Sequence, residues 1–184
     1  MGLAAADLAL RERLARSGAL FGGYHPEMAR LHAEHARRLR AHLARFGWPR
    51  AEAAAEAAWL IVQHAIAEPD FQRGMLAALR EVAAAGGVLA SRVAALEDRI
   101  AAFEGRAQRF GTQLDWDEAG ELSPWPRVEA PERVDERRAQ VGLGPLAEHV
   151  AALRAEAAAH GARPPADLAA YRAEALRWAR SVGW

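Results

Sequence analysis

Residues 52–67, EAAAEAAWLIVQHAIA, contain the stretch that decides the fold class. The large apolar side chains of this stretch belong to Trp59, Leu60, Ile61, Val62 and Ile66. They occupy nearly all directions around a helix, so this helix is expected to be buried on every side and to lie centrally. Ala, the strongest helix former, supplies 47 of the 184 residues, and there are only three Ile. The sequence therefore predicts a mainly α protein.

Further helical stretches are predicted on both sides of this helix, bounded by Gly and Pro. They cover residues 3–17, 26–46, 71–85, 89–104, 131–140, 145–160 and 164–182. Gly18 and Gly22-Gly23 separate the first two, and Pro26 suits the first position of the second. We expect residues 1–184 to form one domain, a bundle of about seven helices that ends in a C-terminal helical pair over residues 145–184.

Residues 106–128 interrupt the helical pattern. Apolar or β-favouring residues alternate there with other types, and they are Phe110, Thr112, Leu114 and Trp116. Alternation with a period of two is typical of a strand, and the turn-like segment 117–120 follows it. We therefore expect a small β-hairpin or an extended flap near residues 107–123, inserted between the helices.

Three residue types are absent from the chain, namely Cys, Lys and Asn. Without Cys there is no thiol nucleophile, disulfide or thiolate metal ligand, and without Lys there is no Schiff base or Walker A lysine. The 24 Arg balance 24 acidic residues, and a net charge of zero argues against a nucleic-acid partner. Any chemistry must therefore come from imidazoles and carboxylates.

The expected location follows from the absence of targeting patterns. No apolar run approaches the roughly 18 residues of a membrane-spanning helix. Residues 1–16 mix Arg, Asp and Glu with apolar residues and lack the pattern of a signal peptide. We expect a cytoplasmic protein with no membrane partner, and the oligomeric state stays open.

Gln63 and His64 are the large polar residues in the second half of the central helix. Buried polar side chains need hydrogen-bond partners, so either an internal network or a ligand pocket should surround them. His64 can act as an acid or base near neutral pH, whereas Gln63 can only orient or recognise a ligand. His64 is therefore the first candidate for a catalytic residue.

Three histidines, His32, His35 and His42, fall on the apolar face of the second predicted helix. His32 and His35 are three positions apart, close enough to share a metal ion if Asp98 or His64 supplies a further ligand. The candidate metal ligands are thus His32, His35 and His64. No HExxH motif is present, and the simpler interpretation is a half-buried polar face whose imidazoles pair with carboxylates.

A second polar group begins in the fifth predicted helix with Asp98 and Arg99. Asp98 lies on a face of small Ala residues, and a buried Asp is uncommon unless it is paired, so it is either a structural ion-pair partner or a catalytic acid or base. Arg99 would hold an anionic group. Gln108, Thr112 and Gln113 form an uncharged hydrogen-bonding set that either recognises a polar ligand or fastens a loop to the core.

Six short strings together make the chain resemble a bacterial family known as domain of unknown function 6624, nearly end to end. The strings are Tyr24-His25-Pro26, Gly47-Trp48-Pro49, Ala58–His64, Leu96–Ile100, Gln108–Gln113 and Val134–Arg138. The family usually has Tyr where Phe110 stands and often has Asn where His35 stands, which weakens a family-wide metal site built on His35. The resemblance implies no reaction. It implies a common fold and a shared pocket around Gln63, His64, Asp98, Arg99, Gln108 and Gln113.

Together these features favour a small-molecule enzyme or ligand-binding protein that uses acid–base chemistry without an organic cofactor, for a hydrolysis, isomerisation or elimination. The catalytic candidates are His64, Asp98 and His32. The substrate-binding candidates are Gln63, Arg99, Gln108, Thr112 and Gln113.

Two alternatives stay open. In one, the polar residues form a structural network in an interaction protein that docks through Trp116 and Trp125. In the other, a divalent metal is bound by His32, His64 and Asp98.

Overall fold

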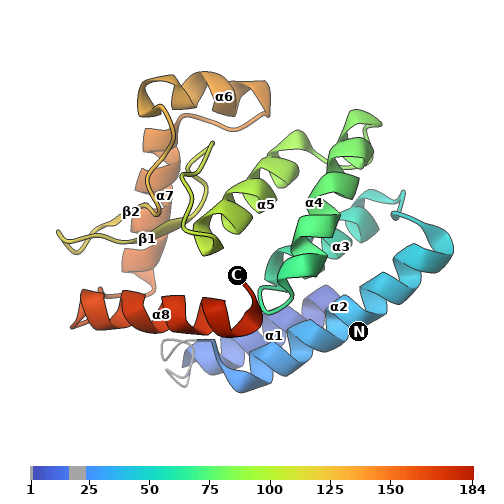
Figure 1. Cartoon of the computed structure of the whole chain (residues 1–184), viewed down its shortest axis with the longest axis horizontal. Helices are drawn as coiled ribbons and strands as arrows, with labels where there is room; N and C mark the ends of the chain where they lie inside the picture. The colour runs from blue at the N-terminus through green and yellow to red at the C-terminus, as the bar shows by residue number, and fades with distance from the viewer. Residues whose placement is uncertain (1, 17–23) are drawn as a thin grey trace. The chain divides into compact units, whose positions relative to one another are not determined.

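The computed structural model describes residues 2–16 and 24–184 (Figure 1). These described residues form eight α-helices, one short 3-10 helix and one two-stranded antiparallel sheet, so the mainly α class with a small hairpin is confirmed. The predicted break at Gly18 and Gly22-Gly23 lies outside the described residues. The chain divides into two compact units, residues 1–88 with Gly183 and residues 89–182 with Trp184. The single domain over residues 1–184 stays a prediction.

The first unit contains four helices, α1 (Leu3–Arg16), α2 (Pro26–Phe46), α3 (Glu52–His64) and α4 (Pro69–Ala84). Helix α3 packs against each of the other three, and α1 also packs against α2 (Figure 1). Within this unit α3 is therefore the central helix, as the sequence predicts. Its buried side chains include Trp59, Ile61 and Val62.

Helix α3 ends at His64, three residues before its predicted end. The side-chain amide of Gln72, on α4, donates to the carbonyl oxygens of Val62 at 2.7 Å and Gln63 at 3.1 Å. Carbonyls in the last turn of a helix lack further helical donors, so a side chain from elsewhere can satisfy them. Gln72 is fully buried, and its two hydrogen bonds fix the end of α3 and hence the position of His64.

Helix α2 begins with a side-chain cap, because His25 Nδ1 accepts a hydrogen bond from the backbone N–H of Glu27 at 3.2 Å. Its buried residues are Met28, His32, His35, Ala36 and Leu39. His42 lies beyond this buried stretch and is exposed, in contrast to the expectation that all three histidines share the apolar face. His32 and His35 are thus the two histidines of α2 that the first unit buries.

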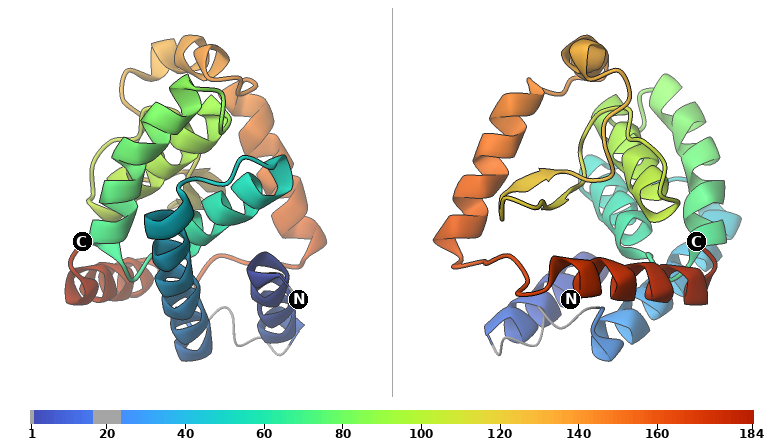
Figure 2. Two further views of the ribbon diagram at one scale, coloured as in Figure 1. Left: turned by 90° about the vertical axis from the view of Figure 1, so that its right-hand side faces the viewer. Right: turned by 60° about the vertical axis from the view of Figure 1, so that its left-hand side comes forward.

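The second unit carries the hairpin and the remaining helices. Its elements are α5 (Ala90–Phe103), β1 (Leu114–Trp116), β2 (Leu122–Pro124), η2 (Pro131–Arg133), α6 (Val134–Gln140), α7 (Leu146–Ala159) and α8 (Leu168–Val182). The two strands pair with Asp115 opposite Ser123, and β2 packs against α7 (Figure 2). Among the described helices of the chain, none combines the length and the apolar character needed to cross a membrane.

Helix α8 begins at Leu168, four residues after its predicted start at Pro164. Pro165 disfavours a helical conformation at the residue before it, so Pro164 cannot open the helix. Asp167 caps the helix instead, since its Oδ1 accepts a hydrogen bond from the backbone N–H of Ala170 at 2.8 Å.

Candidate functional site

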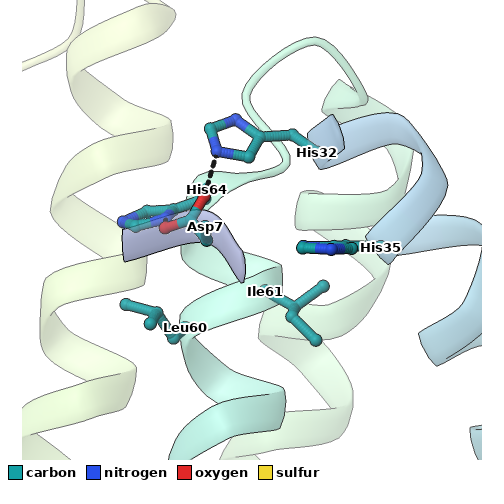
Figure 3. A pocket seen from close by; sticks show the side chains of 6 residues that line it. All are labelled: Asp7, His32, His35, Leu60, Ile61 and His64. Atoms are coloured by element: carbon teal, nitrogen blue, oxygen red, sulfur yellow. Dashed lines mark hydrogen bonds and ion pairs between the residues drawn. The ribbon is translucent and has the colours of Figure 1, made fainter. Parts of the chain in front are cut away.

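In the first unit, the carboxylate of Asp7 lies between two imidazoles (Figure 3). Its Oδ1 is 2.5 Å from Nε2 of His32, and its Oδ2 is 2.8 Å from Nδ1 of His64. The three residues come from α1, α2 and the last position of α3, respectively. Three successive helices therefore bring one carboxylate and two imidazoles together, although His32 and His64 are 25 and 57 positions from Asp7.

Asp7 was not among the residues singled out from the sequence. Leu3, Leu10 and Leu14 form the apolar stripe of α1. Asp7 is four positions after Leu3 and three before Leu10, and residues three or four apart lie on the same face of a helix, so Asp7 belongs to this stripe. Asp7 and Leu14 are each 4% exposed. A carboxylate within an apolar helical stripe was the available signal, because that position becomes buried as soon as the helix packs.

The surroundings of Asp7 keep it ionised. Burial of its carboxylate opposes ionisation, but hydrogen bonds and electrostatic attraction from His32 and His64 outweigh burial and hold the pKa of Asp7 well below its ordinary value. A buried carboxylate at neutral pH therefore carries a full negative charge, which needs a cationic partner close by.

Tyr24 completes the contacts of His32. Its hydroxyl oxygen lies 2.8 Å from Nδ1 of His32, the ring nitrogen that faces away from Asp7, and the two rings stack with centroids 5.8 Å apart. Burial, together with the negative charges of Asp7 and Glu68, raises the pKa of Tyr24. The phenol therefore stays protonated and neutral, and both nitrogens of His32 have defined partners.

His64 lies on the more open side of the cluster, with its side chain 19% exposed against 8% for His32. The two imidazoles are tilted against each other, with ring centroids 5.3 Å apart. A shallow pocket here is lined by Asp7, His32, His35, Leu60, Ile61 and His64 (Figure 3). The space between these described side chains is too small for a water molecule. An organic ligand must therefore approach His64 from the solvent side of the pocket. Only a single ion could fit between the polar atoms of Asp7, His32 and His64.

His35 lines the same pocket without joining the cluster. Burial lowers the pKa of His35, against the opposing charge of Asp7. Its imidazole is therefore neutral at neutral pH, and it forms part of the wall beside Ile61.

Asp7, His32 and His64 are also a potential set of metal ligands. One nitrogen of each histidine and one carboxylate oxygen all lie within 4.8 Å of one another. Imidazole nitrogen and carboxylate oxygen are typical zinc ligands. Of the metal candidates proposed from the sequence, His32 and His64 belong to this group and His35 does not, and the carboxylate is Asp7 of α1.

Comparison with known proteins shows the family to which the chain belongs. The profile of the family described as "Family of unknown function (DUF6624)" matches residues 1–162. The chain belongs to this family. The suspected resemblance is thus confirmed, and Asp7, His32 and His64 all lie within the matched residues. No curated protein and no solved structure gives a significant match to the chain.

The second unit of this DUF6624 chain contains the other predicted polar group. Asp98 is fully buried, and its carboxylate accepts hydrogen bonds from the backbone N–H groups of Arg109, Phe110 and Thr112 and from the Thr112 hydroxyl. Burial raises the pKa of Asp98, while these hydrogen bonds oppose the rise. The carboxylate therefore fastens the loop that begins after α5.

Gln108 and Gln113 hold the same loop of the DUF6624 chain. The Gln108 amide donates to the carbonyl oxygens of Gln113 at 2.8 Å and Pro126 at 3.0 Å, and its oxygen accepts the Gln113 N–H at 2.8 Å. Arg138, 2% exposed, donates to the Phe110 carbonyl oxygen at 2.6 Å. These contacts are those expected for a structural network. Ligand recognition by these residues stays a prediction.

The remaining predicted residues are divided between the two units of the DUF6624 chain. Gln63 is 5% exposed on α3, one position before His64. Arg99 is half-buried on α5. Trp125, after the hairpin, is 42% exposed, and the Arg172 guanidinium lies 3.7 Å from the centre of its ring.

Proposed function

We propose that the protein is a small-molecule enzyme whose acid–base centre is formed by Asp7, His32 and His64. The observation that carries this proposal is the contact of one ionised, buried carboxylate with two imidazoles, both of which line a pocket. Asp7 is the positioning residue, and His64 is the residue that meets the substrate.

The contact between Asp7 and His64 determines what the imidazole can do. When Nδ1 of His64 donates its proton to Asp7 Oδ2, its Nε2 carries a lone pair and is the basic nitrogen. A carboxylate in this position orients the ring and stabilises the imidazolium that forms when Nε2 takes a proton from substrate or water. Such proton transfer typically contributes about 10²–10⁴-fold to a rate. Hydrolysis, isomerisation and elimination all need this step.

His32 and Tyr24 support the same carboxylate from the other side. The hydrogen bond from His32 to Asp7 Oδ1 and the Tyr24 contact to His32 form a chain of three polar groups. This chain restrains the Asp7 carboxylate, so that Oδ2 stays directed at His64. We assign Asp98, Gln108 and Gln113 to holding the loop of the second unit, because their polar atoms are engaged there.

The wall of the pocket limits the substrate to a small group presented at its mouth. Leu60, Ile61 and the neutral His35 offer no charge to a ligand. Apart from the imidazoles, Asp7 is the only ionisable group among the described residues that line the pocket. Its negative charge disfavours an anionic group of a ligand in the pocket. A neutral or cationic reacting group is therefore favoured.

The test is a turnover screen with the full chain and three variants. Small uncharged esters and amides and their amine-bearing cationic analogues are supplied to the wild type, His64→Gln, Asp7→Asn and His42→Gln, with phosphoesters and hydroxy acids as anionic classes that should not react. We expect one class to be turned over, with a loss of about 100-fold or more in kcat for His64→Gln and Asp7→Asn. His42→Gln is the matched control, since His42 is exposed on α2. Equal turnover by His64→Gln and the wild type would overturn the proposal.

A further inference from the structure

We infer that Asp7, His32 and His64 form a binding site for one divalent transition-metal ion of the Zn²⁺ type. The inference deepens the proposed function by naming the cofactor of the same site, and only the catalytic use of the ion rests on that function. With an ion bound at Nδ1, His64 is a ligand and its Nε2 carries the proton, so water on the ion would replace Nε2 as the base. The ligand atoms are His32 Nε2, His64 Nδ1 and one oxygen of Asp7. The two nitrogens now contact different oxygens of this carboxylate, Oδ1 and Oδ2.

The spacing of these atoms is close to that of a metal site. Tetrahedral ligands at bonds of about 2.0–2.1 Å lie roughly 3.3 Å from one another. Asp7 is now 2.5 Å from His32 and 2.8 Å from His64, and all three ligand atoms lie within 4.8 Å. Side-chain shifts that shorten the widest of these separations by up to roughly 1.5 Å would therefore convert the hydrogen-bonded cluster into a coordination site. No rearrangement of the helices is required.

The surroundings of His32 match those of a metal-bound histidine. A histidine that binds metal through one ring nitrogen almost always donates the N–H of the other nitrogen to an acceptor. With Nε2 of His32 directed at the site, its Nδ1 is 2.8 Å from the Tyr24 hydroxyl oxygen, which can accept that hydrogen bond. Tyr24 would thus fix the tautomer and the orientation that coordination requires.

Charge and space favour an ion over an organic ligand at the centre of the cluster. The Asp7 carboxylate is 4% exposed, and a cation bound to it would compensate the unfavourable burial of its charge. His64 is the last residue of α3, and the C-terminal end of a helix favours positive charge. The described side chains leave no space for a water molecule between them, but an ion bonded directly to three of them needs none.

Metal binding would balance protons in a simple way. When Nε2 of a neutral His32 binds the ion, the imidazole carries its proton on Nδ1 and donates it to the Tyr24 hydroxyl oxygen. A histidine that is an imidazolium before binding releases one proton to solvent. The three protein ligands leave a fourth tetrahedral position, and His64 is on the open side of the cluster. Water that reaches this position from the open side at His64, outside the space between the three ligands, would be the acid–base group that a catalytic zinc site supplies.

The inference is tested by titrating the full chain, freed of metal by a chelator and carrying no histidine tag, with Zn²⁺ in a calorimeter. We expect one Zn²⁺ per chain. Affinity should fall by more than about 100-fold in Asp7→Asn, His32→Gln and His64→Gln, and stay unchanged in His42→Gln. Circular dichroism reports whether each variant is folded. A wild type without stoichiometric binding, or Asp7→Asn with the affinity of His42→Gln, would overturn the metal site.

A second measurement covers the case in which a ligand variant does not fold. Co²⁺ added to the metal-free wild type should give the intense visible absorption of a four-coordinate ion with nitrogen and oxygen ligands. The weak spectrum of hydrated Co²⁺ would overturn the site. Turnover without metal binding would leave the acid–base proposal standing alone, whereas metal binding without turnover would remove the enzymatic proposal and keep the site.

Discussion

Asp7 Oδ2 lies 2.8 Å from His64 Nδ1, although 57 positions separate the two residues in the sequence. This contact joins the first helix of the chain to the end of the central helix α3. The same carboxylate also contacts His32 on α2. One buried charge thereby links three helices of the first unit, and its loss should affect both their stability and the site.

Replacement of Asp7 by Asn should lower the free energy of unfolding by about 3 kcal/mol at pH 7, because two imidazoles lose their buried ionised partner. Urea denaturation followed by circular dichroism measures this change. Asp70→Asn is the matched control, since the Asp70 side chain is fully exposed, and it should leave stability almost unchanged. Equal stability of Asp7→Asn and the wild type would show that the buried pair contributes little.

Acid should destabilise the protein through the same carboxylate. The pKa of Asp7 is lowered in the folded state by hydrogen bonds and charge from His32 and His64, which outweigh its burial. Asp7 therefore stabilises the fold by its full amount at pH values above the pKa of an Asp in the unfolded chain, about 3.9. This stabilisation is lost as the pH falls from there towards the lower pKa of Asp7 in the folded protein. Unfolding free energies measured between pH 6 and pH 2.5, roughly, should fall more steeply for the wild type than for Asp7→Asn. Parallel curves for the two proteins would contradict the lowered pKa.

Tyr24→Phe should weaken Zn²⁺ binding by about 10–100-fold while leaving the protein folded, because His32 loses the partner of its Nδ1. Calorimetric titration measures the affinity. Tyr171→Phe is the control, since the Tyr171 hydroxyl is 3.4 Å from Asp115 in the second unit, and it should bind Zn²⁺ as the wild type does. A Tyr24→Phe protein with unchanged affinity would remove Tyr24 from the site.

Asp98→Asn should destabilise the protein by about 3 kcal/mol and leave the affinity for Zn²⁺ unchanged. Asn offers one acceptor oxygen where the Asp98 carboxylate now serves three backbone N–H groups and the Thr112 hydroxyl. Denaturation and Zn²⁺ titration of one preparation separate the two effects. Weaker Zn²⁺ binding in folded Asp98→Asn would favour the ligand set of His32, His64 and Asp98 over the one with Asp7.

Replacement of Gln72 by Leu should lower stability by about 1–3 kcal/mol, because the carbonyl oxygens of Val62 and Gln63 lose their buried donor. Thermal denaturation measures this effect against Gln140→Leu, a change at an exposed position of α6. Because Gln72 fixes the end of α3, the variant should also weaken Zn²⁺ binding at His64. Unchanged stability would show that the end of α3 does not depend on Gln72.

The sequence could predict the fold class because the signals for it are local. The apolar stretch around Trp59, together with Ala-rich flanks, specifies a central helix without knowledge of its partners. The start of α8 was predicted wrongly because the sequence offers two start signals close together. The prediction used Pro164, whereas Asp167 caps the helix in the structure. The end of α3 depends on Gln72, whose contact is tertiary and has no local pattern.

The candidate site was predicted only in part, for a related reason. His64 and His32 could be singled out because imidazoles are rare on apolar helices, but their shared partner could not. Asp7 belongs to a short helix that looks like a surface helix until its stripe of Leu3, Leu10 and Leu14 is considered. Asp98 attracted attention as a lone carboxylate, yet its partners are backbone N–H groups of a loop, which no side-chain pattern predicts.

The most direct measurement is an NMR titration of the imidazole nitrogens of the metal-free wild type with Zn²⁺. The seven histidines provide their own controls, since His42 and His160 are exposed and lie outside the cluster. We predict large shifts at Nε2 of His32 and Nδ1 of His64 that saturate at one Zn²⁺ per chain, with His42 and His160 unchanged. Coordination shifts on other histidines, or no saturable shift at His32 and His64, would contradict the site formed by Asp7, His32 and His64.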